Sequence, residues 1–504
     1  MKIRKLLVAN RGEIAVRVFR TARAMGIPTV AVYSEADKDA IHVTLADEAI
    51  FIGDSAPSES YLRIDAILDA CAQTGADAVH PGYGFLSERD EFSEACEAAG
   101  IRFLGPPAIA MRRLGGKIEA KTLAVESGVP ITPGFFEPGA SDFALREAAE
   151  QIGYPVMLKA SAGGGGRGMR IVRSPEEFAD ALALAKDEAA KGFGDDAMMV
   201  EKLVVDPRHI EVQFVADSHG QVACLFEREC SIQRRHQKLI EEAPSALPLN
   251  QPKSFDWEGM QSSVRRLALA AGYIGAGTAE FMVDRETGEF YFLEVNARLQ
   301  VEHPVTEAIT GLDLVELQIR VAQGEMLEID PRLIEGNRTA MNGHSIEVRI
   351  VAEDPAAGFM PSIGRIVGWA EPRHPGIRFD TGFAAGKEVT RFYDSMIAKV
   401  IAHGPSREVA RKRLVAALLD FHVLGVKTNV GYLIDVLTHQ EFIDGTIDTG
   451  FLAREFADWT PPEPPQELPA IAAKSTVQTR AKSETKQPKD VWGQTDGWRV
   501  FALK

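Results

Sequence analysis

The chain has 504 residues, of which 45% are hydrophobic, so it is long enough for about three domains with buried cores, at roughly 100 to 200 residues per domain. Its formal net charge of −16 and sequence pI of about 5.3 argue against a nucleic acid or an anionic membrane surface as the main partner. Any anion that this chain binds must therefore meet a local cluster of basic residues.

The amino-terminal segment is interpreted as a buried strand and not as an export signal. MKIRKLLVAN starts with basic and then apolar residues, but RGEIAVR interrupts before the apolar core of such a signal would be complete. No apolar run approaches the roughly 18 residues of a membrane span. The four cysteines show neither a disulfide framework nor a C-x-x-C pair. These features predict a soluble, cytoplasmic protein that binds no membrane.

The first 115 residues alternate between strand-like and helical segments. KLLVAN is followed by GEIAVRVFRTARAMGIPTVAVYS, in which Gly26 and Pro28 close a helix, and EAIFIG, ADAVHPGYG and IRFLGP are further strands. This alternation predicts a doubly wound parallel sheet. The turn ANRGEIA lacks the three glycines of a dinucleotide fingerprint, so a nicotinamide site is not favoured.

Residues 116–330 are expected to form a second domain that includes a small α+β lid at about 131–205. PVMLKA, MRIV and AMMVEKLV read as its strands and SPEEFADALALAKDEAAK as a helix, and the pattern turns to β from His209. Residues 336–458 are expected to form a third, mixed domain. The Pro-, Lys- and Glu-rich segment 459–504 predicts a linker or tail, whose two terminal tryptophans could dock on this subunit or on a partner.

The stretch EVNARLQVEHPVTE places a polar residue at every second position from Glu294 to Glu302. In an extended chain, side chains alternate between faces, so Glu294, Asn296, Arg298, Gln300 and Glu302 would all project from one side. An amphipathic strand with one wet face gives the same alternation. Two carboxylates, a guanidinium and two amides are instead typical of a binding surface.

A hairpin with the preceding strand predicts a metal site. TAEFMVD and the opening of this stretch are separated by the turn RETGE, and pairing Asp284 with Phe290 sets Met282 opposite Phe292 and Glu280 opposite Glu294. Facing carboxylates repel each other unless a cation lies between them, and Asn296 adds an oxygen on the same face. Such oxygen ligands favour Mg²⁺ or Mn²⁺ over Zn²⁺. A register shifted by one residue would instead point one acid away.

Magnesium held by few protein oxygens commonly shares its shell with phosphates, so a phosphate site is expected nearby. KASAGGGGRGMR, residues 159–170, follows a strand and offers glycine amides to an anion, with Lys159 at its entrance. It does not match the P-loop, and an isolated glycine run is more often a flexible loop. Lys117 and the basic segment QRRHQK, Gln233 to Lys238, are further cationic candidates, although a charge run is commonly just an exposed turn.

Eight motifs in order resemble those of biotin carboxylase, an ATP-grasp enzyme. They are NRGEIA, HPGYGFLSE, KASAGGGGRGMR, RECSIQRRHQKLIEEAP, GTAEF, EVNARLQVEHPVTE, EVRIVAEDP and FYDSMIAKV. They run from residue 1 to about residue 458, roughly nine-tenths of the chain. The resemblance implies an α/β and α+β multidomain fold with a doubly wound amino-terminal domain, an ATP-grasp domain with its lid, and a biotin carboxylase carboxy-terminal domain.

The resemblance also implies a MgATP site. Lys117 and Lys159 would bind phosphates under the glycine loop, which includes Gly164, Gly165 and Gly166. The backbone of Glu201 and Leu203 would meet adenine. The rest of the pocket would consist of Lys202, His209, Gln233 and His236, with the metal on Glu280, Glu294 and Asn296.

In this family, bicarbonate attacks the γ-phosphate of ATP to give carboxyphosphate, and a ureido nitrogen of biotin is then carboxylated. Glu302 matches the base that deprotonates bicarbonate, and Arg298, Gln300 and the Val301 amide would hold that anion. Lys238 would stabilise the transferring phosphoryl group, and Arg349 the enolate-like oxygen of biotin. No AMKM-like biotinylation sequence occurs, so biotin would arrive on a separate carrier protein.

The implied assembly is the biotin carboxylase subunit of an acetyl-CoA or acyl-CoA carboxylase, as used in fatty acid biosynthesis. It would be a homodimer that works with a biotin carboxyl carrier protein and a carboxyltransferase, without nucleic acid. The chain could also be part of a longer subunit or belong to a pyruvate carboxylase. Another ATP-grasp ligase and a regulatory protein that has lost catalysis are the competing hypotheses. The intact Lys238, Arg298, Glu302 and Arg349 argue against the latter.

Overall fold

The computed structural model describes residues 2–137, 139–161, 168–235, 237–247 and 256–462. The segment up to Trp459 forms one compact unit. The predicted glycine-loop positions 164–166, His236 and the tail beyond residue 462 lie outside the described residues.

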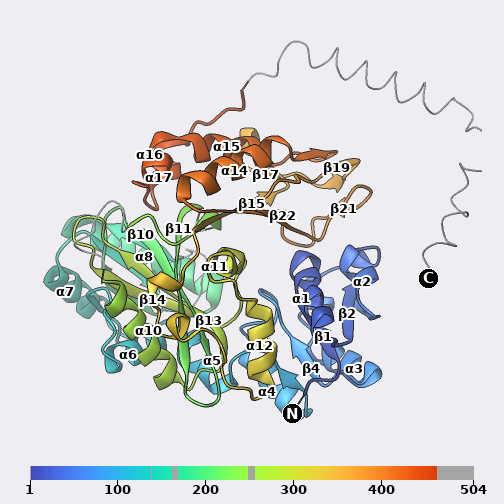
Figure 1. The fold of residues 1–504 in the computed structure, drawn as a ribbon. Coiled ribbons are helices and arrows are strands. Elements are labelled where there is room, and N and C mark those ends of the chain that lie inside the picture. Colours follow the sequence, from blue (N-terminus) through green and yellow to red (C-terminus); the bar gives the residue numbers. More distant parts are fainter. Residues whose placement is uncertain (1, 138, 162–167, 236, 248–255, 463–504) are drawn as a thin grey trace, which may run out of the picture. The chain divides into compact units, whose positions relative to one another are not determined.

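The amino-terminal domain is a parallel sheet of five strands in the order β3-β2-β1-β4-β5 (Figure 1). Its strands are β1 (Leu6–Val8), β2 (Thr29–Ser34), β3 (Glu48–Gly53), β4 (Ala78–His80) and β5 (Arg102–Phe103). Leu6 and Val8 pack in the same core as helix α1 (Gly12–Ala24), whereas Leu7 packs with α3 (Ile64–Thr74) and α4 (Asp90–Ala98). Because alternate residues of a strand face opposite sides, helices cover both faces, and the predicted doubly wound sheet is confirmed.

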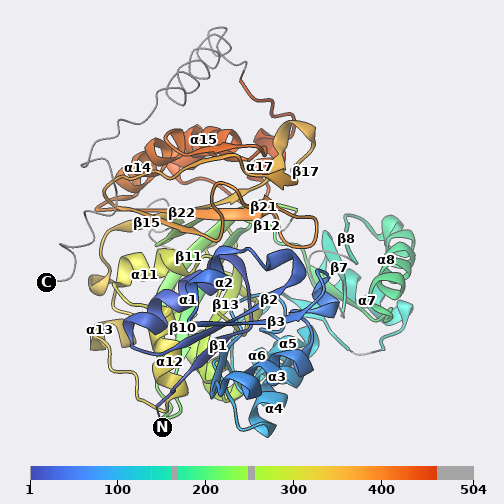
Figure 2. The same ribbon diagram turned by 90° about the vertical axis from the view of Figure 1, so that its right-hand side faces the viewer.

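The segment expected as a lid forms an antiparallel sheet in the order β6-β9-β7-β8. Its strands are β6 (Gly134–Phe135), β7 (Val156–Ala160), β8 (Met169–Val172) and β9 (Met198–Lys202). Helices α7 (Asp142–Ile152) and α8 (Phe178–Phe193) lie beside this sheet, as Figure 2 shows. Leu145, Val156, Leu182 and Val200 are buried together between the helices and the sheet. The strand and helix assignments made from hydrophobic periodicity are confirmed here.

An eight-stranded sheet in the order β14-β13-β10-β11-β12-β15-β22-β20 is the largest sheet in the described part of the chain. Its strands are β10 (Arg208–Ala216), β11 (Val222–Arg234), β12 (Gln237–Ala243), β13 (Gly275–Val283), β14 (Phe290–Asn296), β15 (His344–Val351), β20 (Ile377–Thr381) and β22 (Met396–Gly404). The last three belong to the segment expected as a third domain, yet they continue the sheet of the second. Pairing of β12 with β15 sets Glu241 opposite Glu347 and joins the two segments through backbone hydrogen bonds.

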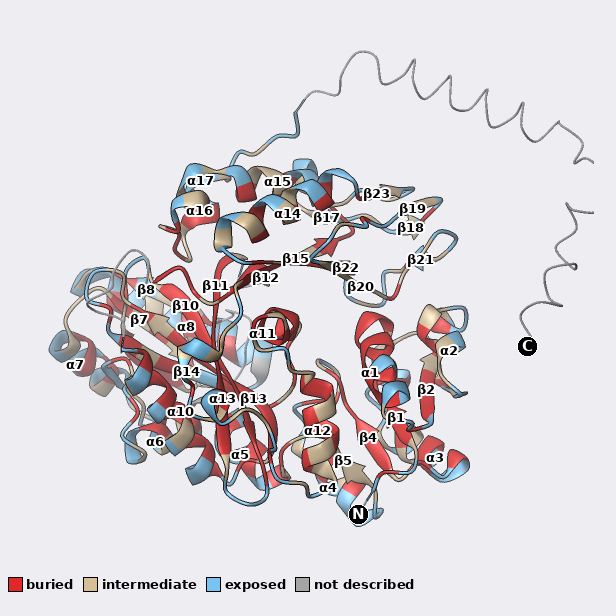
Figure 3. Cartoon of the chain, in the orientation of Figure 1, coloured by how far each residue is buried: buried red, intermediate tan, exposed pale blue. Residues whose placement is uncertain are grey.

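Both faces of this sheet are covered, and Figure 3 shows its strands β10, β11 and β13 largely buried. Helices α10 (Trp257–Ala271) and α12 (Leu314–Ala322) pack on the β10–β13 part, and α14 (Arg407–Leu419) packs on β15 and β22. Helix α11 (His303–Thr310) contacts β11, β12, β15 and β22. Every helix in the described part of the chain is too short or too polar to cross a membrane.

Two histidines of the amino-terminal domain are buried in surroundings that suit only the neutral ring. His80 Nδ1 accepts the backbone N–H of Gly82 at 2.9 Å, so its Nε2 donates to Gln318 at 3.1 Å. His42 Nδ1 likewise accepts the N–H of Gly12. A second ring proton would face a donor in each case, and burial lowers the pKa of both histidines to about 4.

We therefore expect the free energy of unfolding to decrease as the pH falls from about 6.5 to 4. In this window the unfolded chain binds protons that the buried rings exclude, which costs at most ~3 kcal/mol per histidine. Urea unfolding at several pH values measures the slope. His80→Asn should be less stable at neutral pH but show a flatter slope, whereas the exposed His219→Asn should keep the wild-type slope. An unchanged slope in His80→Asn would contradict this account.

Candidate active site

Lys238 on β12 lies at the centre of a buried cluster of acids. Its ammonium group donates to Glu211 of β10 at 2.6 Å, to Glu280 of β13 at 2.8 Å and to Glu302 at 2.8 Å. Glu302 stands at the N-cap position of helix α11, where its side chain makes no capping hydrogen bond, and all three acids are buried. Three strands and one helix end therefore meet at a single positive charge.

The charges of the cluster hold Glu302 and Glu280 in the ionised form. Burial alone would raise the pKa of Glu302, but the charges of Lys238 and Arg349 outweigh it and hold the pKa below its usual range. Burial also opposes ionisation of Glu280, whose pKa lies well below normal because of Lys238 and His209. Burial would lower the pKa of Lys238, yet its acidic neighbours raise it well above normal. Glu302 is thus an ionised acceptor, as a general base requires.

Glu280 accepts hydrogen bonds at both carboxylate oxygens. Besides Lys238, its Oε1 accepts from Asn296 Nδ2 at 2.8 Å and from Gln300 Nε2 at 2.9 Å, and its Oε2 meets His209 Nε2 at 2.8 Å. Four of the residues that the sequence suggested for separate roles therefore converge on one carboxylate.

The hairpin prediction is right at its centre and wrong at its turn. Glu280 is opposite Glu294, as expected, but Val283 and not Asp284 pairs with Phe290, and Met282 faces Tyr291. A β-bulge after Glu280 inserts one extra residue on β14 and restores the register of the acids. The side chain of Glu280 is buried, whereas Glu294 is exposed.

The expectation of one extended polar face from Glu294 to Glu302 is wrong beyond Asn296. Strand β14 ends there, and the chain turns before α11 begins at His303. Val295, Ala297 and Leu299 are buried in the core, whereas Val301 is only half-buried. The polar side chains are gathered by their contacts with Glu280 and Lys238 and not by strand alternation.

The chemistry of the donor set fits a hard divalent cation. Carboxylate oxygens from Glu280 and Glu294 and the amide oxygen of Asn296 are ligands that Mg²⁺ accepts. Asn296 Oδ1 accepts from Arg298 at 2.9 Å, and Lys238 supplies the positive charge beside Glu280. Arg298 and Lys238 would have to move away from these oxygens before a cation could bind them.

Arg298 and Arg349 border a cavity of about 470 Å³ that also touches Val301 and, from the amino-terminal domain, Glu13 and Tyr83. Arg349 on β15 donates to Glu302 at 3.0 Å and to Glu241 at 2.6 Å. The cavity therefore brings together segments from all three parts of the chain.

Some ion-pair partners of the predicted site residues were not predicted from the sequence. Arg298 forms an ion pair with Glu88 at 3.0 Å, and Glu88 also accepts the backbone N–H of Ala297 at 3.1 Å. Burial raises the pKa of Glu241 to about 7, although the charge of Arg349 lowers it. Glu88 closes the quoted motif HPGYGFLSE and could have been found there. Glu241 lies in the motif RECSIQRRHQKLIEEAP and could have been found in the same way, whereas Glu211 lies on β10, outside the eight motifs.

The residues suggested for nucleotide binding fall into two groups. In the lid, Lys159 donates to Glu201 at 2.6 Å and Lys202 donates to the Gly153 carbonyl at 2.8 Å, while the Leu203 N–H donates to Pro155 at 3.2 Å. On the central sheet, Gln233 pairs with Lys238 across the β11–β12 hairpin. Lys117 begins helix α6 (Lys117–Glu126), and its side chain is outside what the structure describes.

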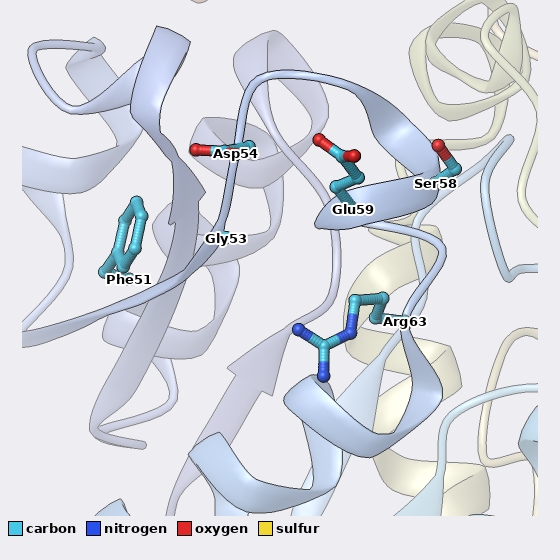
Figure 4. Close-up of a pocket in the computed structure, with 6 residues that line it drawn as sticks. All are labelled: Phe51, Gly53, Asp54, Ser58, Glu59 and Arg63. Atoms are coloured by element: carbon cyan, nitrogen blue, oxygen red, sulfur yellow. The ribbon is translucent and has the colours of Figure 1, made fainter.

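A second hollow, of about 400 Å³, lies on the amino-terminal domain (Figure 4). It is lined by Phe51, Gly53, Asp54, Ser58, Glu59 and Arg63. These residues come from the end of β3 and the segment before α3, and the acid cluster around Lys238 contributes none of its lining.

Three family models match successive parts of the chain. Biotin carboxylase, N-terminal domain, matches residues 2–111, carbamoyl-phosphate synthase L chain, ATP binding domain, matches residues 116–330, and biotin carboxylase C-terminal domain matches residues 347–454. The alpha subunit of a mitochondrial methylcrotonoyl-CoA carboxylase from Dictyostelium discoideum is 43% identical over 99% of the chain and 70% of its own length. The chain belongs to the biotin carboxylase family. This family consists of ATP-dependent ligases that act on biotin.

Other relatives of this biotin carboxylase chain are similar to it over most of its length. The alpha subunit of mitochondrial methylcrotonoyl-CoA carboxylase from Oryza sativa is 48% identical over 90% of the chain and 60% of its own length. The propionyl-CoA carboxylase alpha chain of Ruegeria pomeroyi is 47% identical over 90% of the chain and 68% of its own length. The chain thus spans roughly two thirds of these relatives.

Solved structures of biotin carboxylases share the whole fold. The biotin carboxylase domain dimer of Hydrogenobacter thermophilus 2-oxoglutarate carboxylase, in complex with MgADP, ADP and bicarbonate, matches with a TM-score of 0.85 and 44% identity. It covers 92% of this chain and 100% of that one. A Campylobacter jejuni biotin carboxylase in complex with β,γ-ATP matches with a TM-score of 0.84 and 43% identity over 90% and 99% of the two chains.

We predict that Lys238→Met destabilises the protein by ~3–5 kcal/mol, because three buried carboxylates lose their shared counter-ion. Added Mg²⁺, without nucleotide, should then raise the melting temperature of this variant more than that of the wild type. Lys202→Met is the matched control, since its ammonium meets only backbone carbonyls. Equal Mg²⁺-induced shifts in both variants, measured by calorimetry, would contradict the shared-charge account.

Proposed function

We propose that the chain carboxylates biotin at the expense of ATP, with bicarbonate as the carbon source and carboxyphosphate as the intermediate. The observation that carries the proposal is that Arg298 and Arg349 line one cavity, while Glu302 accepts hydrogen bonds from both Arg349 and Lys238. This reaction needs an ionised acid as a base, an ammonium group to neutralise the phosphoryl group, and two guanidinium groups to bind anions. The MgADP and bicarbonate named for the Hydrogenobacter structure support the same substrates.

The proposed reaction assigns one task to each group. Glu302 takes the proton of bicarbonate, which Arg298, Gln300 and the Val301 amide hold in place for attack on the γ-phosphate. Lys238 neutralises charge on the transferring phosphoryl group. Catalysis by these residues consists of orientation and charge neutralisation, because the leaving group and nucleophile are both anionic.

The second step requires stabilisation of an anionic biotin oxygen. Arg349 borders the cavity and is held at two points, by Glu241 and Glu302, so its guanidinium is fixed in direction. A fixed guanidinium stabilises a developing oxyanion without reorganisation. Arg349 is therefore assigned to the ureido oxygen of biotin.

The nucleotide is assigned to the remaining predicted residues. Lys117 and Lys159 are assigned to the phosphates, under the glycine loop with Gly164, Gly165 and Gly166, and the backbone of Glu201 and Leu203 is assigned to adenine. The rest of the pocket is assigned to Lys202, His209, Gln233 and His236. Glu280, Glu294 and Asn296 hold Mg²⁺, for which Mn²⁺ is a chemically similar substitute. Mg²⁺ supplies charge neutralisation for the phosphate oxygens when it is bound.

The proposed partners follow from the relatives. Because these are alpha subunits of methylcrotonoyl-CoA and propionyl-CoA carboxylases, we assign the chain to the first half-reaction of an acyl-CoA carboxylase, with a biotin carboxyl carrier and a carboxyltransferase. The dimer named for the Hydrogenobacter domain supports a homodimer. The four cysteines are buried and unpaired, which supports a reducing compartment such as the cytoplasm, and several relatives are named as mitochondrial.

ATP hydrolysis with Mg²⁺ and bicarbonate, measured with and without free biotin, tests the proposal. We expect biotin to stimulate turnover, and we expect Arg298→Ala to reduce biotin-dependent turnover by ~10²-fold or more, because the anion loses its main positive partner. Arg332→Ala, which removes an exposed arginine paired with Asp330, is the control and should retain wild-type turnover. Turnover that is indifferent to biotin would instead indicate another ATP-grasp ligase.

A further inference from the structure

Arg228 on β11 is a fully buried arginine whose five N–H donors all have acceptors. The donors of its guanidinium reach Glu211 (2.5 Å), Gln213 (2.7 Å), Thr306 (3.0 Å), Thr278 (3.1 Å) and Gln300 (2.7 Å). No donor remains for a ligand. Arg228 therefore acts on a bound molecule only through the residues that it holds.

The first of these residues is Gln300, whose amide orientation is fixed from two sides. Its Oε1 accepts from Arg228 and its Nε2 donates to Glu280 at 2.9 Å. A flipped amide would point its NH₂ at a guanidinium and its oxygen at a carboxylate, and both contacts are repulsive. Arg228 thus ensures that Gln300 presents donors, and not its oxygen, on the side of the acid cluster.

Arg228 also acts on Lys238, through Glu211. Glu211 accepts from Arg228 at one oxygen and from Lys238 at the other, at 2.6 Å. Arg228 also donates to Thr306 on α11, the helix that Glu302 precedes. One guanidinium therefore sets the relative positions of Gln300, Lys238 and the first turn of that helix.

We propose that Arg228 is a positioning residue for bicarbonate, which holds Gln300 and Lys238 at the spacing that one small anion requires. This inference rests on the proposed function. A lysine at position 228 keeps the positive charge but has three donors on a single atom, so it cannot span five acceptors in one plane. The loss should therefore appear mainly in bicarbonate binding, because none of the five residues that Arg228 contacts directly is assigned to MgATP.

Arg228→Lys tests this against a matched control, Arg208→Lys. Arg208 on β10 is as deeply buried, pairs with Glu229 at 2.6 Å and donates to the Gly445 carbonyl, away from the acid cluster. We expect Arg228→Lys to raise the KM for bicarbonate by roughly 10–100-fold and to change the KM for MgATP by less than about 3-fold, because small misplacements of a binding group are costly. Arg208→Lys should leave both KM values within about 3-fold of the wild type and lower only the melting temperature.

Two results would overturn the proposal. The first is a bicarbonate KM in Arg228→Lys equal to that of the control, and the second is a parallel rise of both KM values, which indicates general structural damage. If Arg228→Lys does not fold, Thr278→Val and Thr306→Val decide, since each removes one acceptor of the guanidinium. They should raise the KM for bicarbonate alone by about 3–10-fold, and an unchanged KM would contradict the proposal.

The same assay separates this inference from the proposed function. Wild-type protein that hydrolyses no ATP in response to bicarbonate would overturn the proposed function and this inference with it. Wild-type turnover that depends on bicarbonate, combined with an unaltered Arg228→Lys variant, would overturn only the role of Arg228.

Discussion

One buried ammonium group shared by three buried carboxylates is the constraint on which the site depends. Carboxylates this close cannot all stay ionised without a cation, and removing them from water is costly unless each oxygen finds a donor. Lys238 supplies the cation, and Arg228, Arg349, His209, Asn296 and Gln300 supply the further donors. The strands and the helix end that carry the acids are therefore held in register by charge as well as by backbone hydrogen bonds.

The site also requires that the segments expected as separate domains share one sheet. Arg349 reaches Glu302 and Glu241 only because β15 pairs directly with β12, across the boundary suggested by the sequence. The amino-terminal domain joins through Glu88, which meets Arg298 and the backbone beside it. The site is therefore assembled from three parts of the chain.

Local pattern and spacing predicted much of this molecule. The doubly wound sheet and the lid strands follow from hydrophobic periodicity and turn residues. The prediction that Glu280 faces Glu294 is correct although the predicted register at the turn is off by one residue, because the bulge on β14 compensates for it. The bulge on β14 was not predictable, because an extra residue leaves no mark in an alternating pattern. The end of the strand at Asn296 was also missed, because the polar alternation continues past it to Glu302. Arg228 opens the motif RECSIQRRHQKLIEEAP, yet the sequence indicates no role for it or for Glu211, since their partners lie on separate elements that only the fold brings together.

The most direct measurement of the central claim is a crystal structure of this chain with MgADP and bicarbonate. The account predicts that the metal lies on Glu280 and Glu294, that the Lys238 ammonium has moved from Glu280 towards the anion, and that bicarbonate lies within hydrogen-bonding distance of Arg298 and Gln300. A structure in which Lys238 keeps its contact with Glu280 while metal and bicarbonate bind elsewhere would contradict it.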